Sequence, residues 1–279
     1  MKDKVVKTAL KIYYKFPFLK IFKSPLSKFY KKHLLKNQER GIVETEVNGI
    51  KYKLDLSEYI DSYIYNGNYE MDSNKLVKKY VKHGMIVMDA GANMGYFTLM
   101  FAKIVGTGRV YSFEPSVPVF KKMEENIKLN GFRNIIAENK ALSDVDKIDE
   151  GNFVYSFKHG GNYTAKKEEK CEFITLDKYF KDNDIQGLDF AKIDIDGFEE
   201  KMIRGSIETL KRFKPILLLE VSISYLQPKA VLISMLELLK SIGYGLYDEH
   251  ERETTIEKIM EENERIGGIN VLLKHADKK

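Results

Sequence analysis

Two short stretches contain residues of the types and spacing needed to bind a nucleoside. In "MIVMDAGANMGYFTL" (85–99), an apolar run ends at Asp89 and is followed by Gly91, Asn93 and Gly95. Glycine lets a ligand approach the backbone, and asparagine is one of the few other residues that tolerate a left-handed φ. In "RVYSFEP" (109–115), the apolar part ends at Glu114. An acid at that point can accept hydrogen bonds from both hydroxyls of a ribose.

The spacing of the small residues distinguishes between ligands. Dinucleotide sites use G-x-G-x-x-G, with a pyrophosphate on the helix N-terminus, but Tyr96 stands where the last glycine would be. The phosphate-binding pattern G-x-x-x-x-G-K-[ST] is absent. A G-x-N-x-G turn, with Glu114 19 residues after Gly95, therefore indicates a nucleoside without phosphates. S-adenosylmethionine fits that description, and the alternative is a generic turn with a surface glutamate.

Acids and histidines at other strand ends are candidates for catalysis. In "AKIDIDGFEEKMIRG", Asp194 ends a buried strand and faces the ligand edge, so it is the preferred catalytic residue. Asp196 and Glu199 have the spacing of a capping box, so Asp196 is equally a candidate helix N-cap. His159, in a polar loop, and His250, after the sixth strand, are weaker candidates for the base that a hydroxyl substrate requires.

A shared metal ion is compatible with the acids but not expected. Asp194, Asp196 and Glu220, which ends the following strand, could together bind Mg²⁺ because hard cations favour carboxylate oxygens. Nothing in the sequence fixes such a geometry, so activity without metal is expected. The only cysteine, Cys171, excludes an internal disulfide and a cysteine-based zinc site.

Alternating strands and helices must position these residues. The alternation predicts a parallel sheet covered on both faces, whose last two strands are antiparallel neighbours with no strong helix between them. Residues 145–170 are polar and are expected to form a loop or small insertion, and Asn48-Gly49 centres a predicted hairpin. The predicted strands are 86–90, 109–113, 135–140, 188–194, 215–221, 244–249 and 269–275. The predicted helices are 95–105, 116–130, 197–212 and 228–242.

The charge is concentrated at the N-terminus. The net charge is +5, but residues 1–36 contain eleven lysines and one acid, so the rest of the chain carries −5. Lysines are interspersed with aromatic residues in this arm, which suggests amphipathic helices. We favour the interpretation that these helices cap the main domain. The alternatives are contact with an anionic membrane surface and contact with nucleic acid. No stretch approaches the about 18 apolar residues of a membrane span, and no secretory signal is visible. A cytoplasmic location is therefore expected. The alternative is a cytoplasmic protein that also contacts the inner face of the membrane.

The sequence also resembles the FkbM-type S-adenosylmethionine-dependent methyltransferases from about residue 60 onwards. The resemblance implies a class I methyltransferase (Rossmann-like) α/β fold with seven strands, all parallel except the last, in a domain at 59–279 that follows the basic arm and hairpin at 1–58. It implies that Asp89, Gly91, Asn93 and Gly95 surround the methionine part of the cofactor, that Glu114 binds the ribose, that Ser143 and Asp144 lie beside the adenine, and that Glu70 closes the pocket. The motifs are "GNYE" (67–70), "DAGANMGYFTLMFA" (89–102), "GRVYSFEP" (108–115), "ENIKLNG" (125–131), "ALSD" (141–144), "TLDKYF" (175–180), "KIDIDGFEEKMIRG" (192–205) and "PILLLE" (215–220).

The expected activity is O-methylation of a hydroxyl on a sugar or natural product, so the expected partner is a small-molecule or glycan acceptor. The family usually has Glu where this chain has Asp196, which argues against a role for that residue that needs the longer side chain. A nucleic-acid methyltransferase is disfavoured because no Asn/Asp-Pro-Pro-Tyr motif follows the fourth strand. A non-catalytic nucleoside-binding module is the other alternative, and the sequence does not predict an oligomeric state.

Overall fold

The computed structural model describes residues 41–158, 162–223 and 227–278. The basic arm and His159 therefore lie outside the described residues. By their internal contacts the residues form two compact units. The first ends at Met71 and takes in Val154–Lys166, and the second comprises Asp72–Phe153 and Lys167 onwards. The boundary at 58/59 stays a prediction.

The first unit contains the predicted hairpin. Strands β1 (Ile42–Val47) and β2 (Ile50–Asp55) are antiparallel, with Val47 opposite Ile50. Asn48 and Gly49 between them both have left-handed φ values, 54° and 72°, which is the conformation that a two-residue turn between twisted strands requires. Helix α4 (Tyr59–Tyr65) follows, and its Asp61 carboxylate accepts a hydrogen bond from the backbone N–H of Asp55 at 2.6 Å.

The second unit is built on a seven-stranded sheet with the order β11-β12-β10-β9-β3-β4-β5. All pairings are parallel except those of β12, which runs antiparallel to both β10 and β11. This confirms the predicted sheet and its reversed last strand. The strands are β3 (Ile86–Ala90), β4 (Arg109–Phe113), β5 (Ile135–Glu138), β9 (Phe190–Ile193), β10 (Ile216–Val221), β11 (Tyr244–Tyr247) and β12 (Ile269–His275).

The winding of the sheet reverses between β3 and β9. From β3 the chain builds outwards through β4 and β5, and it then returns to place β9 on the other side of β3, with Ala90 opposite Ile193. Ligands of such sheets bind at the carboxyl ends of the strands at this reversal. The glycine turn and Asp194 both begin there.

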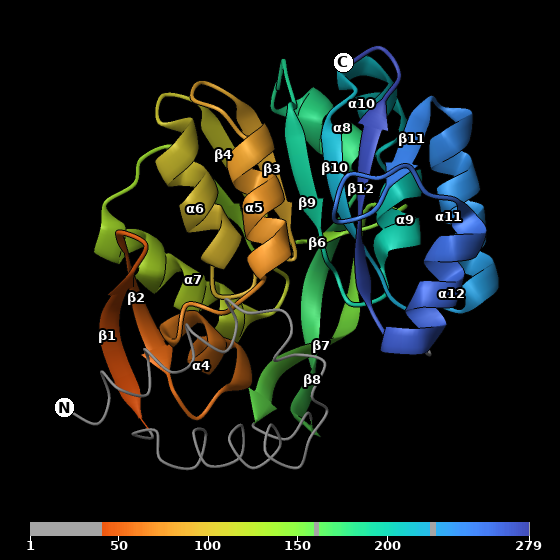
Figure 1. The fold of residues 1–279 in the computed structure, drawn as a ribbon. Coiled ribbons are helices and arrows are strands. Elements are labelled where there is room, and N and C mark those ends of the chain that lie inside the picture. Colours follow the sequence, from red (N-terminus) through yellow and green to blue (C-terminus); the bar gives the residue numbers. More distant parts are fainter. Residues whose placement is uncertain (1–40, 159–161, 224–226, 279) are drawn as a thin grey trace. The chain divides into compact units, whose positions relative to one another are not determined.

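Helices cover the sheet, and Figure 1 shows α5 and α6 in front of β3 and β4. The predicted helix 197–212 is two helices that are separated at Gly205 and Ser206, where the carbonyl of Gly205 accepts a hydrogen bond from the N–H of Asp177 at 3.0 Å. The expectation of no helix between the last two strands is wrong, since α12 buries Ile259, Met260 and Asn263 beneath an acid-rich exterior. The helices are α5 (Met71–Tyr80), α6 (Tyr96–Val105), α7 (Val117–Asn130), α8 (Leu176–Asp182), α9 (Glu199–Arg204), α10 (Ile207–Phe213), α11 (Lys229–Ser241) and α12 (Ile256–Ile266).

The segment expected as a loop or small insertion is an insertion that consists mainly of two long strands. β7 (Lys147–Lys158) and β8 (Asn162–Ile174) join the short β6 (Ala141–Leu142) in a three-stranded sheet with the order β6-β8-β7. The Lys-Lys-Glu-Glu-Lys run at 166–170 hides the alternation that would reveal β8 in the sequence.

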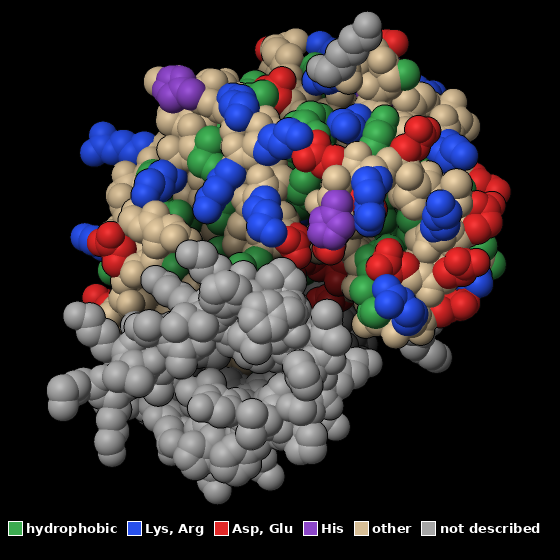
Figure 2. Space-filling view, viewed as in Figure 1, with side chains coloured by type: hydrophobic (Ala, Val, Ile, Leu, Met, Phe, Trp, Pro, Cys, Tyr) green, Lys and Arg blue, Asp and Glu red, His purple; other side chains and the backbone are tan. Residues whose placement is uncertain are grey.

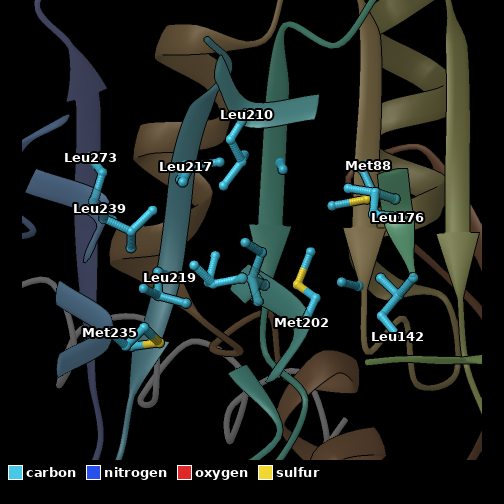
Figure 3. Close-up of a cluster of buried hydrophobic side chains, with 14 of the residues drawn as sticks. Met88, Leu142, Leu176, Met202, Leu210, Leu217, Leu219, Met235, Leu239 and Leu273 are labelled. Carbon is cyan, nitrogen blue, oxygen red and sulfur yellow. The ribbon is translucent and has the colours of Figure 1, made fainter. Parts of the chain in front are cut away.

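The core lies between the sheet and helices α8 to α12. Figure 3 shows Met88 of β3, Leu217 and Leu219 of β10 and Met202 of α9 among its buried side chains. Fully burying each such side chain contributes about 1.5–3 kcal/mol. Among the described residues, no helix is long and apolar enough to cross a membrane.

Candidate nucleoside and methyl-transfer site

The turn after β3 alternates left-handed residues with ordinary ones. Gly91, Asn93 and Gly95 have φ values of 80°, 50° and 93°. The backbone N–H groups of Gly91 and Ala92 both donate to the carbonyl of Phe113, the last residue of β4, at 3.0 and 2.9 Å. The spacing G-x-N-x-G is therefore explained by backbone conformation, because glycine and asparagine tolerate left-handed φ best.

Gly91 also has no room for a side chain. A Cβ at this position would lie 1.7 Å from the carbonyl oxygen of Asp194 and 3.1 Å from Ile195. The backbone N–H of Asp194 donates to the carbonyl of Ala90 at 3.0 Å. The turn after β3 and the end of β9 are thus in direct backbone contact, and neither can move alone.

Substitution of Gly91 should lower both stability and cofactor affinity. A larger residue would crowd a ligand that lies against the turn, and the contact with Asp194 indicates a cost of about 1–3 kcal/mol in folding as well. Gly131→Ala is the matched control, because Gly131 has a φ of 66° but open space around its Cα. We expect Gly91→Ala to lower the melting temperature and the affinity for S-adenosylhomocysteine well beyond Gly131→Ala. Equal effects of the two variants would contradict the packing role.

Glu114 is buried and held by the backbone at both carboxylate oxygens. Its Oε2 accepts from the N–H of Asn93 and its Oε1 from the N–H of Ser116, each at 2.9 Å. The Asn139 amide donates to the carbonyls of Glu114 and Pro115 at 2.8 and 2.9 Å, which fixes the backbone beneath the acid. Burial raises the pKa of Glu114 to about 7, although these backbone hydrogen bonds oppose the shift. Each oxygen retains a lone pair for a ligand hydroxyl.

Asp89 lies below the glycine turn. It is almost fully buried, and its Oδ2 accepts a hydrogen bond from the Thr98 hydroxyl at 2.6 Å. Thr98 also bonds to Ser112 at 2.9 Å, so α6 is linked to β3 and β4. Burial raises the pKa of Asp89, while the nearby charge of Lys192 lowers it.

Asp194 forms an ion pair with a buried lysine. The Nζ atom of Lys192 lies 2.6 Å from Oδ2 of Asp194 and 4.8 Å from the centre of the Phe97 ring. Burial alone would raise the pKa of Asp194, but the charge of Lys192 and a hydrogen bond with Glu220 hold it below its ordinary value. The charge of Asp194, followed by burial, raises the pKa of Glu220 well above the ordinary range. A hydrogen bond between two carboxyl groups needs one proton, and the opposite directions of the two pKa shifts place it on Glu220, which donates to Asp194.

The N-cap role considered for Asp196 is wrong. Helix α9 starts at Glu199 after Phe198, with no side-chain cap, and Asp196 adopts a left-handed φ of 52°. Glu199 takes over the local hydrogen bonding, because its carboxylate accepts from the N–H groups of Ile195 and Gly197 at 2.9 and 3.0 Å. Asp196 is exposed to solvent, but the protein packed around its carboxyl group and the charge of Asp194 raise its pKa to about 6.

The other predicted residues are more dispersed. Ser143 is buried and its hydroxyl donates to Asp144 at 3.1 Å, next to the α9–α10 junction. His250 is exposed on the loop after β11 and pairs with Glu249 at 3.7 Å. In the part of the chain that the structure describes, no hydrogen bond or ion pair joins His250 to Asp194. Glu70, with a φ of 47°, belongs to the first unit.

Lys192 and Asn139 were not singled out from the sequence, and Glu199 was considered only for its capping-box spacing from Asp196. Lys192 had a usable signal: a lysine between Ala191 and Ile193 in a buried strand needs a carboxylate, and Asp194 is two residues away on the same face. Within the described ranges, no group of three or more His, Cys, Asp or Glu side chains is arranged to hold a metal ion.

The buried acids should make stability depend on pH. Burial raises the pKa of Glu199 to about 7, as it does for Glu114, from an ordinary 4.5. Between those values the folded protein keeps protons that the unfolded chain has lost, so the free energy of unfolding falls as pH rises. Without ligand, we expect the free energy of unfolding to increase by a few kcal/mol when the pH is lowered from about 8 to about 5.5, at about 1.4 kcal/mol per pKa unit. The melting temperature should rise with it. Glu199→Gln should flatten this profile, and a melting temperature that falls over the same range would contradict the shifts.

Comparison with known proteins agrees with this geometry. A family model of the methyltransferase FkbM domain matches residues 89–246, more than half of the chain. No curated protein matches the sequence. The strand order with one reversed strand, the glycine turn and the acid ending the next strand define a class I S-adenosylmethionine-dependent methyltransferase. The chain belongs to the FkbM methyltransferase family.

The solved structures to which the chain is similar have low sequence identity and TM-scores below 0.5. A methyltransferase FkbM from Methylobacillus flagellatus KT is 16% identical with a TM-score of 0.46, and the match covers 69% of this chain but only 44% of that one. A putative rRNA-methylase from Clostridium thermocellum is 12% identical (TM-score 0.45; 74% and 95% covered). Aeropyrum pernix fibrillarin with natively bound S-adenosyl-L-methionine is 14% identical (TM-score 0.44; 87% and 86% covered). Likenesses at this level say nothing about the substrate of this chain.

Proposed function

We propose that the protein transfers a methyl group from S-adenosylmethionine to a hydroxyl of a sugar or natural product. The observation that carries this proposal is the group of acids at the carboxyl ends of β9 and β10, in backbone contact with the glycine turn through Gly91 and Asp194. A hydroxyl must lose a proton when it is methylated, and a carboxylate beside the cofactor site can accept it.

The residues of the site fit this cofactor. When bound, S-adenosylmethionine supplies an electrophilic methyl group on a positively charged sulfur. Glu114, anchored by two backbone N–H groups, has lone pairs directed away from those bonds for the ribose hydroxyls. The turn from Asp89 to Gly95 would hold the methionine part, with Ser143 and Asp144 at the adenine and Glu70 at the amino-acid end.

Loss of the Glu114 carboxylate should weaken cofactor binding. Calorimetry should show 1:1 binding of S-adenosylhomocysteine by the wild type and little affinity for NAD. Glu114→Ala should cost about 1.5–3 kcal/mol, or about tenfold to a hundredfold in affinity. Glu138→Ala is the control, because Glu138 ends the neighbouring strand but pairs with Lys140 and Tyr179 instead. Unchanged affinity in a folded Glu114→Ala protein would place the ribose elsewhere.

Asp194 is the proposed catalytic base, with His159 and His250 as alternatives. Asp194→Asn should stay folded, because loss of its charge lets Glu220 ionise and become the partner of Lys192. Methyl transfer should be lost while S-adenosylhomocysteine still binds. Asp196→Asn should fold, since asparagine tolerates the left-handed backbone, and should retain most activity. The opposite ranking would assign the base to Asp196.

The acceptor can be sought directly with labelled cofactor. Mass spectrometry of glycan, glycolipid and small-molecule pools after incubation should reveal an added methyl group with the wild type and none with Asp194→Asn. Label in RNA or DNA would favour the nucleic-acid alternative. Cofactor binding with no label in any pool would favour a binding module.

One surface feature keeps nucleic acid as an alternative. Figure 2 shows several Lys and Arg side chains on one face of the molecule. Helix α5 and the residues that follow it carry four exposed lysines, Lys75, Lys78, Lys79 and Lys82. Lys75 and Lys79 pair with Asp72 and Glu251, which reduces the charge available to a phosphate backbone. A solvated helix face accounts for this pattern equally well.

The basic arm is a proposed membrane contact, at the inner face if the protein is cytoplasmic. About 1 kcal/mol per lysine near an anionic surface would hold the enzyme beside a lipid-linked acceptor. Full-length protein should then float with anionic but not neutral vesicles, less so with added salt, and deletion of residues 1–36 should abolish flotation. If the shortened protein loses its melting transition and the full-length protein ignores vesicles, the arm is a structural cap.

A further inference from the structure

The C-terminal part of strand β8, which belongs to the second unit, has two different faces. Near its C-terminal end, Cys171 and Phe173 are buried and Glu169 is half-buried, whereas Lys170 and Glu172 are exposed. Alternate residues of a strand point to the same side, so Glu169, Cys171 and Phe173 share a face. The strand is fixed beside β6 with Phe173 opposite Ala141, two residues before Ser143.

This face lies against the backbone that follows Glu114, the proposed ribose-binding residue. The Glu169 carboxylate accepts a hydrogen bond from the N–H of Val117, the first residue of α7, at 3.0 Å. A carboxylate is favoured at the N-terminus of a helix. Val117 is three residues after Glu114, so β8 holds the segment that positions the proposed ribose contact.

Cys171 is the central residue of the face. It is 5% exposed and packs with Ala141 and Phe173, and the partly buried Phe198 packs against the same cluster. Burial raises the pKa of the Cys171 thiol to about 11, and the charge of Glu114 adds to the shift, which indicates that the thiol and this carboxylate are close. The cluster joins the segments that end β4, precede Ser143 and begin α9.

A buried hydroxyl points to a ligand at the same place. Ser116 is fully buried, and its Oγ has no hydrogen-bond partner among the described residues. Buried polar side-chain atoms nearly always have a partner, so a missing one calls for an explanation. A nucleoside, whose ribose and adenine carry several donors and acceptors, can supply it.

We propose that β8 forms a wall of the nucleoside pocket, with Cys171 and Phe198 facing the adenine and Glu169 holding the start of α7, where Ser116 can bond to the ligand. The assignment rests on the proposed S-adenosylmethionine site. It gives a binding role to a strand outside the main sheet and to the only cysteine of the chain. A small apolar thiol and an aromatic ring suit the flat, largely apolar surface of adenine.

Because Cys171 is the only cysteine, its modification reports on the pocket without ambiguity. The probe is methyl methanethiosulfonate, a small neutral reagent, and the rate of mass increase is followed at alkaline pH. We expect S-adenosylhomocysteine at ten times its Kd to slow modification about tenfold. 5′-Methylthioadenosine, which keeps the nucleoside, should protect at its own saturating concentration, and methionine should not.

Substitution supplies the second measurement. Cys171→Leu should lower the affinity for S-adenosylhomocysteine tenfold or more, whereas Cys171→Ser should change it little. Glu172→Leu is the matched control, since it adds a similar side chain to the opposite face of the same strand. If Cys171→Leu does not fold, the protection experiment decides alone.

The two proposals fail in different ways. Wild-type protein that binds S-adenosylhomocysteine without slowing modification of Cys171, or a folded Cys171→Leu protein with wild-type affinity, would overturn the role of β8 and leave the proposed function intact. Absence of any S-adenosylhomocysteine binding by the wild type would overturn the proposed function, and the role of β8 with it.

Discussion

The site depends on the contact between a glycine without a side chain and the carbonyl of Asp194. The Cα of Gly91 lies against that carbonyl, and the N–H of Asp194 is bonded to Ala90. This contact occurs where the winding of the sheet reverses, so it joins the turn that would hold the cofactor to the acids that would act on the acceptor. The relative position of two functions is thus set by backbone atoms, which vary less than side chains.

The electrostatics of this region follow from one buried lysine close to several acids. The charge of Lys192 lowers the pKa values of four of them, Asp89, Asp194, Asp196 and Glu220. Burial is the main cause that raises the pKa values of Asp89, Glu114, Asp196 and Glu199, and the charge of Asp194 is the main cause for Glu220. A bound cation such as a sulfonium would favour the ionised acids instead. Ligand binding should therefore be accompanied by proton release, which links the charge of the proposed cofactor to the state of the site.

The parts of the fold that the sequence predicts are those with a local signal. The strands of the main sheet, the hairpin at Asn48-Gly49 and the turn at Gly91 to Gly95 each follow from apolar runs or from residues that tolerate left-handed backbone. The errors share a different cause. Helix α12 carries dense charge on its exposed face, and the consecutive charged residues 166–170 interrupt the alternation of strand β8, so the buried residues of both elements are hard to recognise. The break at Gly205 coincides with a hydrogen bond from the distant Asp177. The prediction of an N-cap at Asp196 is wrong because the carboxylate of Glu199 accepts the hydrogen bonds from the N–H groups of Ile195 and Gly197. The catalytic roles remain predictions.

The protonated state of Glu220 has a consequence for how this region can vary. Lys192 is buried and positive, Asp194 is half-buried and negative, and the half-buried Glu220 holds a proton, so the three side chains together carry no net charge. A substitution that changes the charge of one of them would leave an uncompensated charge beside the buried lysine, where water screens it only in part, unless another changes too. A change of charge at position 192, 194 or 220 should therefore be tolerated only together with a compensating change at another of the three. This holds even though the positions are up to 28 residues apart in the sequence.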